Sequence, residues 1–345
     1  MDEQEIRDRL ATVEDPDLGD DLVSLGLVND ITIDDDSVTI DLALGAPYSP
    51  TETDIAENVR ETLADLDVAV ELSASIDEGL DASEQVLPNV TNIIAVASGK
   101  GGVGKSTVAV NLAAGLSELG ADVGLFDADI YGPNVPRMLG SDERPQATSD
   151  EQIIPPEKHG MKLMSIDLLM GEDAPVIWRG PMVDKVLTQL WEDVQWGSLD
   201  YMVVDLPPGT GDTQLTLLQT VPVAGAVIVT TPQEVALDDA RKGLEMFGKH
   251  ETPVLGIVEN MSSFKCPDCG SEHAIFGDGG GEEFAEEMSM PFLGQIPLDP
   301  SIRERGDAGE PIVFGDGETP DAFRSFVEKA ANNQGFVNRR RASEE

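Results

Sequence analysis

The sequence has little cysteine and no long apolar run. Its 345 residues contain two cysteines, Cys266 and Cys269, in the pattern C-P-D-C. A secreted domain held by disulfides would carry more cysteines along its length, so the sequence predicts a reducing compartment. No run reaches the 18 apolar residues of a membrane span, and the first ten residues, MDEQEIRDRL, are charged. We therefore expect a cytoplasmic protein without a membrane span.

Basic residues are also scarce. The chain has 22 Lys and Arg against 66 Asp and Glu, a net charge of -44, and no lysine before Lys100. Such a field repels nucleic acid and anionic membranes, and needs salt to screen its self-repulsion. The chain is nevertheless 40% hydrophobic, enough for a core. We expect a halophilic, folded protein that binds neither nucleic acid nor membrane.

The pattern of apolar residues divides the chain near residue 90. In the first part, helical spacing over 2–13 and 54–66, and alternation in LVNDITIDDDSVTIDLAL and VAVELSASI, predict a small α+β domain over residues 1–80. An acidic stretch with one proline follows, which predicts a linker over residues 81–90.

Short, nearly continuous apolar runs mark the second part. NIIAVAS, YMVVDLP and AGAVIVTT are typical of strands buried on both faces of a sheet. Helical segments at 105–119 and 235–247 lie between such runs, which favours a doubly wound, mostly parallel α/β sheet. We expect this domain to span residues 91–335 and the polar tail, residues 336–345, to be disordered.

A glycine-rich loop follows the first of these strands. GKGGVGKST matches G-x-x-x-x-G-K-[ST] and leads into a helix, the context in which the pattern cradles phosphates. Lys105 would compensate the β- and γ-phosphates of a nucleotide, and the Ser106 hydroxyl would ligate Mg²⁺. The residues predicted to bind nucleotide here are Gly99, Lys100, Gly101, Gly102, Val103, Gly104, Lys105, Ser106 and Thr107.

Lys100 is a second lysine at the start of the loop. It cannot easily serve the phosphates that Lys105 already serves, so we expect it to point outward. There it could supply transition-state charge to a nucleotide bound by a second subunit, as an arginine finger does. A solvated lysine is the alternative.

GKGGVGKST resembles the deviant Walker A motif of the MinD, nitrogenase reductase and ArsA group of dimeric ATPases. For LFDADIYGPN the resemblance implies a switch I in which Asp129 positions the attacking water and Asp127 is its partner at the magnesium. For YMVVDLPPGTGD it implies that Asp205 holds Mg²⁺ through water, together with Ser106. For GIVENMSSF it implies that Asn260 binds adenine.

The ordered set DADIYGPNVPRML, WRGPM, DLPPGTGD, GIVENMS and CPDCG resembles the Mrp/ApbC family of iron-sulfur cluster carrier ATPases, over about residues 90–330. The first domain resembles that of the assembly factors SufT and PaaD. In GAPYSPTE, Ser49 stands where that domain commonly has a cysteine, so docking of a partner is the safer expectation for it. The WRGPM segment, Trp178 to Met182, has no assigned role.

The cysteine pair supplies half of a four-ligand site for a [4Fe-4S] cluster or for zinc. The chain has no further sulfur to complete such a site, whereas a two-fold homodimer would bring a second pair against the first. A zinc knuckle, with His273 close by in sequence, and a redox C-x-x-C are the alternatives.

The resemblance implies a slowly hydrolysing ATPase that uses ATP and Mg²⁺. A [4Fe-4S] cluster would bridge its two subunits, and the partners would be apo iron-sulfur proteins and cluster assembly factors. Lys100, Lys105 and Asp129 would be catalytic. A positioning ATPase like MinD or ParA is an alternative, although the C-terminal FVNRRRASEE has no sustained apolar face. A second alternative function is that of a zinc or nickel metallochaperone.

Overall fold

The computed structural model describes residues 2–34, 36–66, 68–75, 87–150, 152–169, 180–266 and 268–344. They form two compact units: Met1–Asp81 with Ala331–Glu345, and Ala82–Ala330. Trp178 and Arg179, and most of the expected linker, lie outside the described residues. Within the described ranges, no helix is both long and apolar enough to cross a membrane.

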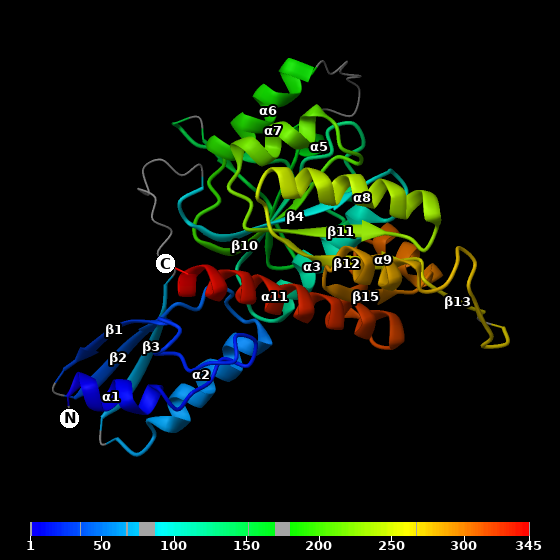
Figure 1. Ribbon diagram of the computed structural model, residues 1–345. Coiled ribbons are helices and arrows are strands. Elements are labelled where there is room, and N and C mark those ends of the chain that lie inside the picture. The colour runs from blue at the N-terminus through cyan, green and yellow to red at the C-terminus, as the bar shows by residue number, and fades with distance from the viewer. Residues whose placement is uncertain are drawn as a thin grey trace. The chain divides into compact units, whose positions relative to one another are not determined.

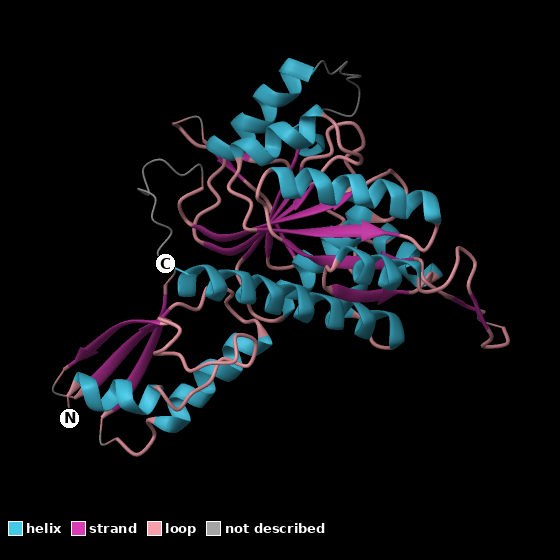
Figure 2. Cartoon of the chain, in the orientation of Figure 1, coloured by secondary structure: helices cyan, strands magenta, loops and turns pink. Residues whose placement is uncertain are grey.

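The first unit is a small α+β domain, as predicted. Its elements are α1 (Glu3–Leu10), β1 (Val28–Ile33), β2 (Ser37–Leu42), α2 (Pro50–Thr62) and β3 (Ala69–Ala74). β2 lies between an antiparallel β1 and a parallel β3. The two helices lie on one face of this sheet (Figure 2). Alternate residues of β2, Val38 and Ile40, are buried in a core with Ile6 of α1 and Ile55 and Val59 of α2. The alternation in the sequence therefore reflects a sheet with one face on the helices.

The second unit contains the apolar strands. Its elements are β4 (Val90–Ser98), α3 (Lys105–Glu118), β5 (Val123–Asp127), α4 (Val135–Met138), β6 (Gln146–Ala147), β7 (Ile153–Ile154), β8 (Glu157–Lys158), β9 (Met161–Ser165), α5 (Ile166–Leu169), α6 (Gly180–Glu192), β10 (Leu199–Asp205), α7 (Asp212–Thr220), β11 (Gly225–Thr230), α8 (Glu234–Lys249), β12 (Val254–Asn260), β13 (Phe264–Lys265), β14 (Glu272–His273), α9 (Gly280–Met288), β15 (Phe292–Ile296), α10 (Pro300–Asp307), a 3₁₀ turn (Ile312–Phe314) and the start of α11 (Glu318–Glu344).

The sheet order is β15-β12-β11-β4-β10-β5-β9-β8, with every neighbouring pair parallel except β8 and β9. The helices α6, α7 and α8 cover one face and α3 the other (Figure 1). Ile93, Ala95 and Ala97 of β4 pack on the α8 side. The doubly wound parallel sheet is thus confirmed. From β4 the chain continues to β5 on one side and later to β11 on the other, so the carboxyl end of β4 is a topological switch point, where such folds bind ligands.

The expectation of a disordered tail is wrong. Residues 336–345 fall almost entirely within α11 and belong to the first unit. There the fully buried Arg339 side chain pairs with Asp15 at 2.6 Å, Asp17 at 2.6 Å and Glu52 at 3.0 Å. The tail has no strong apolar pattern because this segment is held largely by buried charge pairs, whose acidic partners are distant in sequence.

Arg339→Ala should lower the free energy of unfolding of the first unit by about 3–5 kcal/mol, because it leaves buried carboxylates without their cation. Arg340→Ala is the control, since its ion pair with Glu344 is exposed and should contribute about 1 kcal/mol or less. Hydrogen exchange of the β2 amides in the full chain measures the effect within this unit. An equal loss of hydrogen-exchange protection in both variants would contradict the assigned role of Arg339.

Candidate functional site

The glycine-rich loop joins β4 to α3 with two residues in the left-handed region. Gly102 has φ +84° and Gly104 has φ +88°, a conformation that glycine adopts at little cost. A Cβ on Gly104 would also lie 2.0 Å from the Asn260 amide nitrogen. Gly104 is the N-cap of α3 and provides no side-chain cap for it. The loop is therefore suited to an anion at the amino end of α3.

Lys105 and Ser106 both contact one buried carboxylate. Lys105 Nζ lies 2.5 Å from Asp205 Oδ1, and the Ser106 hydroxyl donates to Asp205 Oδ2 at 2.6 Å. Asp205 ends β10, directly beside β4, and is fully buried. Burial raises its pKa while Lys105 opposes the rise. The hydroxyl and the carboxylate are hard oxygen ligands of the kind Mg²⁺ prefers, so Ser106 and Asp205 fit the magnesium role.

Asp127 is the last residue of β5, which lies beside β10 in the sheet, and Asp129 follows two residues later. Asp127 accepts hydrogen bonds from the backbone N–H of Asp129 at 3.2 Å and of Val135 at 3.3 Å, and from the Ser165 hydroxyl at 3.2 Å. Burial and the nearby Asp205 raise the pKa of Asp127 to about 7. Burial also raises the pKa of Asp129. Asp127 thus holds the loop that carries Asp129.

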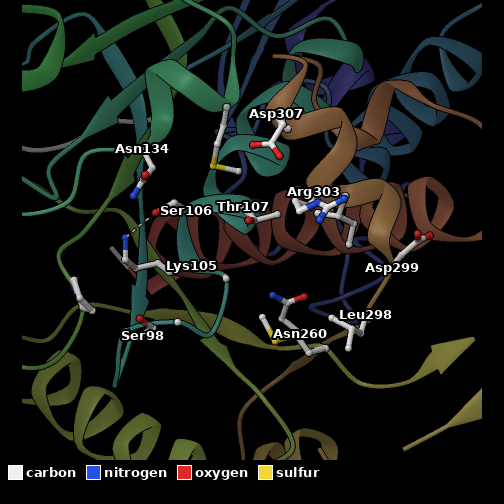
Figure 3. Close-up of a pocket in the computed structure, with 18 of the residues that line it drawn as sticks. Ser98, Lys105, Ser106, Thr107, Asn134, Asn260, Leu298, Asp299, Arg303 and Asp307 are labelled. Atoms are coloured by element: carbon white, nitrogen blue, oxygen red, sulfur yellow. Dashed lines mark hydrogen bonds between the residues drawn. The ribbon is translucent and has the colours of Figure 1, made fainter. Parts of the chain in front are cut away.

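A cavity of about 570 Å³, which we call the loop cavity, opens beside this loop. Figure 3 shows Lys105 and Ser98 at one end and Asp299 and Arg303 at the other. Of the predicted site residues, it is lined by Gly101, Gly102, Gly104, Lys105, Ser106, Thr107, Asp129 and Asn260, and not by Gly99, Lys100, Val103, Asp127 or Asp205. This volume is typical of small-ligand sites.

Sequence reasoning missed the far wall of the loop cavity. That wall includes Pro297, Leu298, Asp299, Ile302, Arg303, Gly306 and Asp307, while Asn134, Arg137 and Met138 of the DADIYGPNVPRML motif also line the cavity. One signal was available for part of it, because IPLDP directly follows the apolar run FLGQ and must therefore start at the carboxyl edge of the sheet. Nothing in the local pattern marks the α10 residues, which carry no motif.

Asn260 ends β12 and contacts the glycine-rich loop. Its amide nitrogen donates to the Val103 carbonyl oxygen at 2.8 Å, and its side chain is buried. The residue therefore holds the loop as well as lining the cavity (Figure 3). Its adenine contact stays a prediction.

Lys100 lies outside the loop cavity. Its ammonium donates to Gln233 Oε1 at 3.3 Å, just before α8. A Cβ on Gly99 would lie 2.1 Å from the backbone carbon of Asp239, so the loop starts tightly packed on α8. No local pattern predicts the Gln233 contact, because only the packing of α8 brings the two residues together.

The cysteines occupy the hairpin of β13 and β14. Both are free thiols; Cys269 is exposed and Cys266 half-buried. The Ser271 hydroxyl, 3.3 Å from Cys269 Sγ, together with the Ser271 backbone and Cys266, lowers the pKa of Cys269. A lower pKa favours the thiolate, the form that binds metals. No three His, Cys, Asp or Glu side chains of the described ranges gather as a metal site.

Ser49 has a structural role in the first unit. It is fully buried, and its hydroxyl accepts a hydrogen bond from the Glu52 backbone N–H at 3.3 Å as the N-cap of α2. A serine is among the favoured residues at such a position. The residue that replaces the commonly found cysteine thus serves helix capping in this chain.

Comparisons with known proteins agree with this geometry. Residues 89–332 match the family of the NUBPL iron-transfer P-loop NTPase, and residues 3–74 match that of the iron-sulfur cluster assembly protein. An iron-sulfur cluster carrier protein of Synechocystis sp. is 47% identical over 91% of this chain and 92% of its own length. One of Escherichia coli (strain K12) is 42% identical over 93% and 89%.

Solved structures share the fold. A nucleotide-binding protein from Archaeoglobus fulgidus, in complex with ADP, is 37% identical, with a TM-score of 0.59 over 68% of this chain and 92% of that one. The cell division ATPase MinD of Pyrococcus furiosus, 24% identical with a TM-score of 0.52 over 69% and 97%, shows the same fold. With the glycine-rich loop and Asp129 lining one cavity, and Asp205 bonded to Lys105 and Ser106 of that loop, the chain belongs to the NUBPL iron-transfer P-loop NTPase family, and it is an ATPase.

Proposed function

We propose that this chain is an ATP-dependent carrier of iron-sulfur clusters. Two copies would hold one [4Fe-4S] cluster between their Cys266 and Cys269 side chains, and nucleotide bound across the same interface would govern loading and release. The observation that carries this proposal is a pair of free thiols on one hairpin, Cys269 exposed and Cys266 half-buried, with a lowered pKa at Cys269. The curated relatives named above bear the carrier name, which supports the same function.

The position of the cysteines supports a bridging site. Cys266 follows Asn260, the last residue of β12 and a residue of the loop cavity, by six residues, so the cysteine hairpin comes shortly after a strand that ends at that cavity. A half-complete metal site on such a hairpin can be completed by a second copy, because a two-fold axis brings the same residues together from both subunits.

The residues divide the ATPase task between them. Lys105 and the loop amides would hold the phosphates, while Ser106 and Asp205 would hold Mg²⁺, which neutralises phosphate charge when bound. Asp129, on the wall of the loop cavity, would orient the attacking water. Because the cysteines and the nucleotide would share one interface, nucleotide state and cluster affinity must influence each other equally.

The recipients of the cluster would be apo iron-sulfur proteins. The first unit, which matches the iron-sulfur cluster assembly protein family, would dock them or the cluster assembly factors. It contains no cysteine, since both thiols of the chain lie in the second unit.

Anaerobic reconstitution of the full chain with iron and sulfide tests the proposal. The wild type should gain about four irons per dimer and a charge-transfer absorption band. Cys266→Ser and Cys269→Ser should lose both, because each variant removes two of the four sulfurs of the bridged site. Thermal melts of the variants check that they fold.

His273→Ala is the matched control. It lies on β14 of the same hairpin, so it changes a potential zinc ligand and leaves the sulfurs in place. It should keep the iron. Iron retained in Cys266→Ser would refute the bridging site, and elemental analysis finding zinc or nickel in place of iron in anaerobically purified protein would refute the cluster assignment.

A further inference from the structure

A second cavity, of about 500 Å³, opens beside Cys266. We call it the cysteine cavity. Pro297, Leu298 and Asp299 line both this cavity and the loop cavity, and they connect β15 to α10. A ligand in one cavity therefore meets residues that also form the wall of the other.

The helix α10 continues this shared wall. Ile302 and Arg303 line the loop cavity, whereas Ser301 and Arg305 line the cysteine cavity. The helix has eight residues and none of its side chains is fully buried. A short, shallowly packed helix between two cavities can shift more readily than the strands of the sheet.

The backbone of the shared wall is bonded directly to the cysteine hairpin. The Leu298 N–H donates to the Ser263 carbonyl at 2.7 Å, and the Ser262 N–H donates to the Ile296 carbonyl at 3.1 Å. Ser263 precedes Cys266 by three residues. A displacement of Leu298 therefore acts on the segment that leads through β13 to Cys266.

Asp299 joins α10 to the start of α11. Its carboxylate caps α10 by accepting from the Ser301 N–H at 2.8 Å, and it accepts from the Thr319 hydroxyl at 2.6 Å. Thr319 is buried. Its neighbour Glu318 pairs with Lys265 of the hairpin at 2.7 Å. One carboxylate thus connects a wall of the loop cavity to a second attachment of the hairpin.

We propose that Asp299 and Thr319 are positioning residues that transmit nucleotide occupancy of the loop cavity to the cysteine hairpin. Nucleotide contacting Leu298, Asp299 or α10 selects one arrangement of this wall, and the Leu298–Ser263 and Asp299–Thr319 hydrogen bonds impose it on the hairpin. Elements joined by direct hydrogen bonds shift together when one of them moves between discrete arrangements. The inference rests on the proposed function only for the use of the cysteines.

The rate of cysteine alkylation by iodoacetamide tests this link in apo protein without iron. A non-hydrolysable ATP analogue with Mg²⁺ should change the wild-type rate by about fivefold or more, the usual lower range of coupling between sites. Thr319→Val removes the hydroxyl at nearly constant volume. It should bind the analogue within about twofold of wild type and bring the ratio of rates with and without analogue close to one.

Thr319→Ser keeps the hydroxyl and should restore the ratio, which loss of packing alone would not explain. Thr252→Val is the matched control, because Thr252 lies before β12, at the opposite edge of the sheet, and it should keep the wild-type ratio. Should Thr319→Val be unstable, Asp299→Asn weakens the same bonds and should bring the ratio of rates closer to one. A wild-type ratio in both Thr319→Val and Asp299→Asn, or no nucleotide effect in the wild type, overturns the link.

The two proposals fail separately. A chain that binds no iron but shows the nucleotide effect on alkylation would refute the carrier function and keep the link. A chain that binds about four irons per dimer but keeps the ratio in Thr319→Val would refute the link alone.

Discussion

Lys105→Ala is expected to reduce ATP turnover by about 100- to 1,000-fold, because it removes a preorganised charge from the phosphates of the transition state. In this chain the lysine also pairs with Asp205 at 2.5 Å. Steady-state phosphate release by the full chain at fixed high salt measures the effect.

The same variant leaves Asp205 buried without a cation, so stability must be measured beside turnover. Lys105→Arg keeps the positive charge but has a side chain of different shape. This variant should retain the fold and still turn over ATP slowly. Lys249→Ala is the surface control, since Lys249 lies exposed in the last turn of α8. Unchanged turnover in a folded Lys105→Ala protein would contradict the role of the glycine-rich loop.

Lys100→Ala should lower turnover by about 1,000-fold or more if Lys100 acts like an arginine finger across the dimer. Lys100 lies outside the loop cavity of its own chain and is held by Gln233 at 3.3 Å. In the dimer it would leave Gln233 for the phosphates of the partner. Binding of nucleotide to the single chain should change little.

Mixing two inactive variants separates action across the dimer from action within one chain. In a heterodimer of Lys100→Ala and Asp129→Asn, the first subunit keeps its own Asp129 and receives Lys100 from the second. An equal mixture should therefore regain about a quarter of wild-type turnover, since half of the dimers are mixed and each has one complete site. Absence of recovery, in variants that still dimerise, would show that Lys100 acts within its own chain.

Much of the second unit is predictable because its signals are local. Strands buried on both faces must be apolar throughout, as in NIIAVAS, so the parallel sheet is visible in the sequence. Gly102 and Gly104 are recognisable because their left-handed backbone suits glycine. The carboxyl ends of parallel strands meet at one edge, which places Asp205 and Asn260 near the loop before any coordinates are known.

Other features depend on contacts that no short pattern encodes. Asp127 holds the loop after β5, because its carboxylate accepts hydrogen bonds from the Val135 backbone N–H and the Ser165 hydroxyl. Burial and the nearby Asp205 raise its pKa to about 7. The shared wall of Pro297 to Asp299 depends on where the chain turns after β15. Such contacts join residues far apart in sequence, so they are decided by packing.

The sequence by itself determined the loop that binds phosphate, the parallel sheet that presents it, and the fact that two cysteines cannot complete a four-sulfur site in one chain. The tertiary structure alone decided that the arginine-rich tail forms the last turns of α11, with Arg339 buried among Asp15, Asp17 and Glu52. Left-handed glycines and buried strands produce patterns among neighbouring residues, so they can be recognised in the sequence. A buried charge is stable only where distant partners meet it, and only the folded chain brings those partners together.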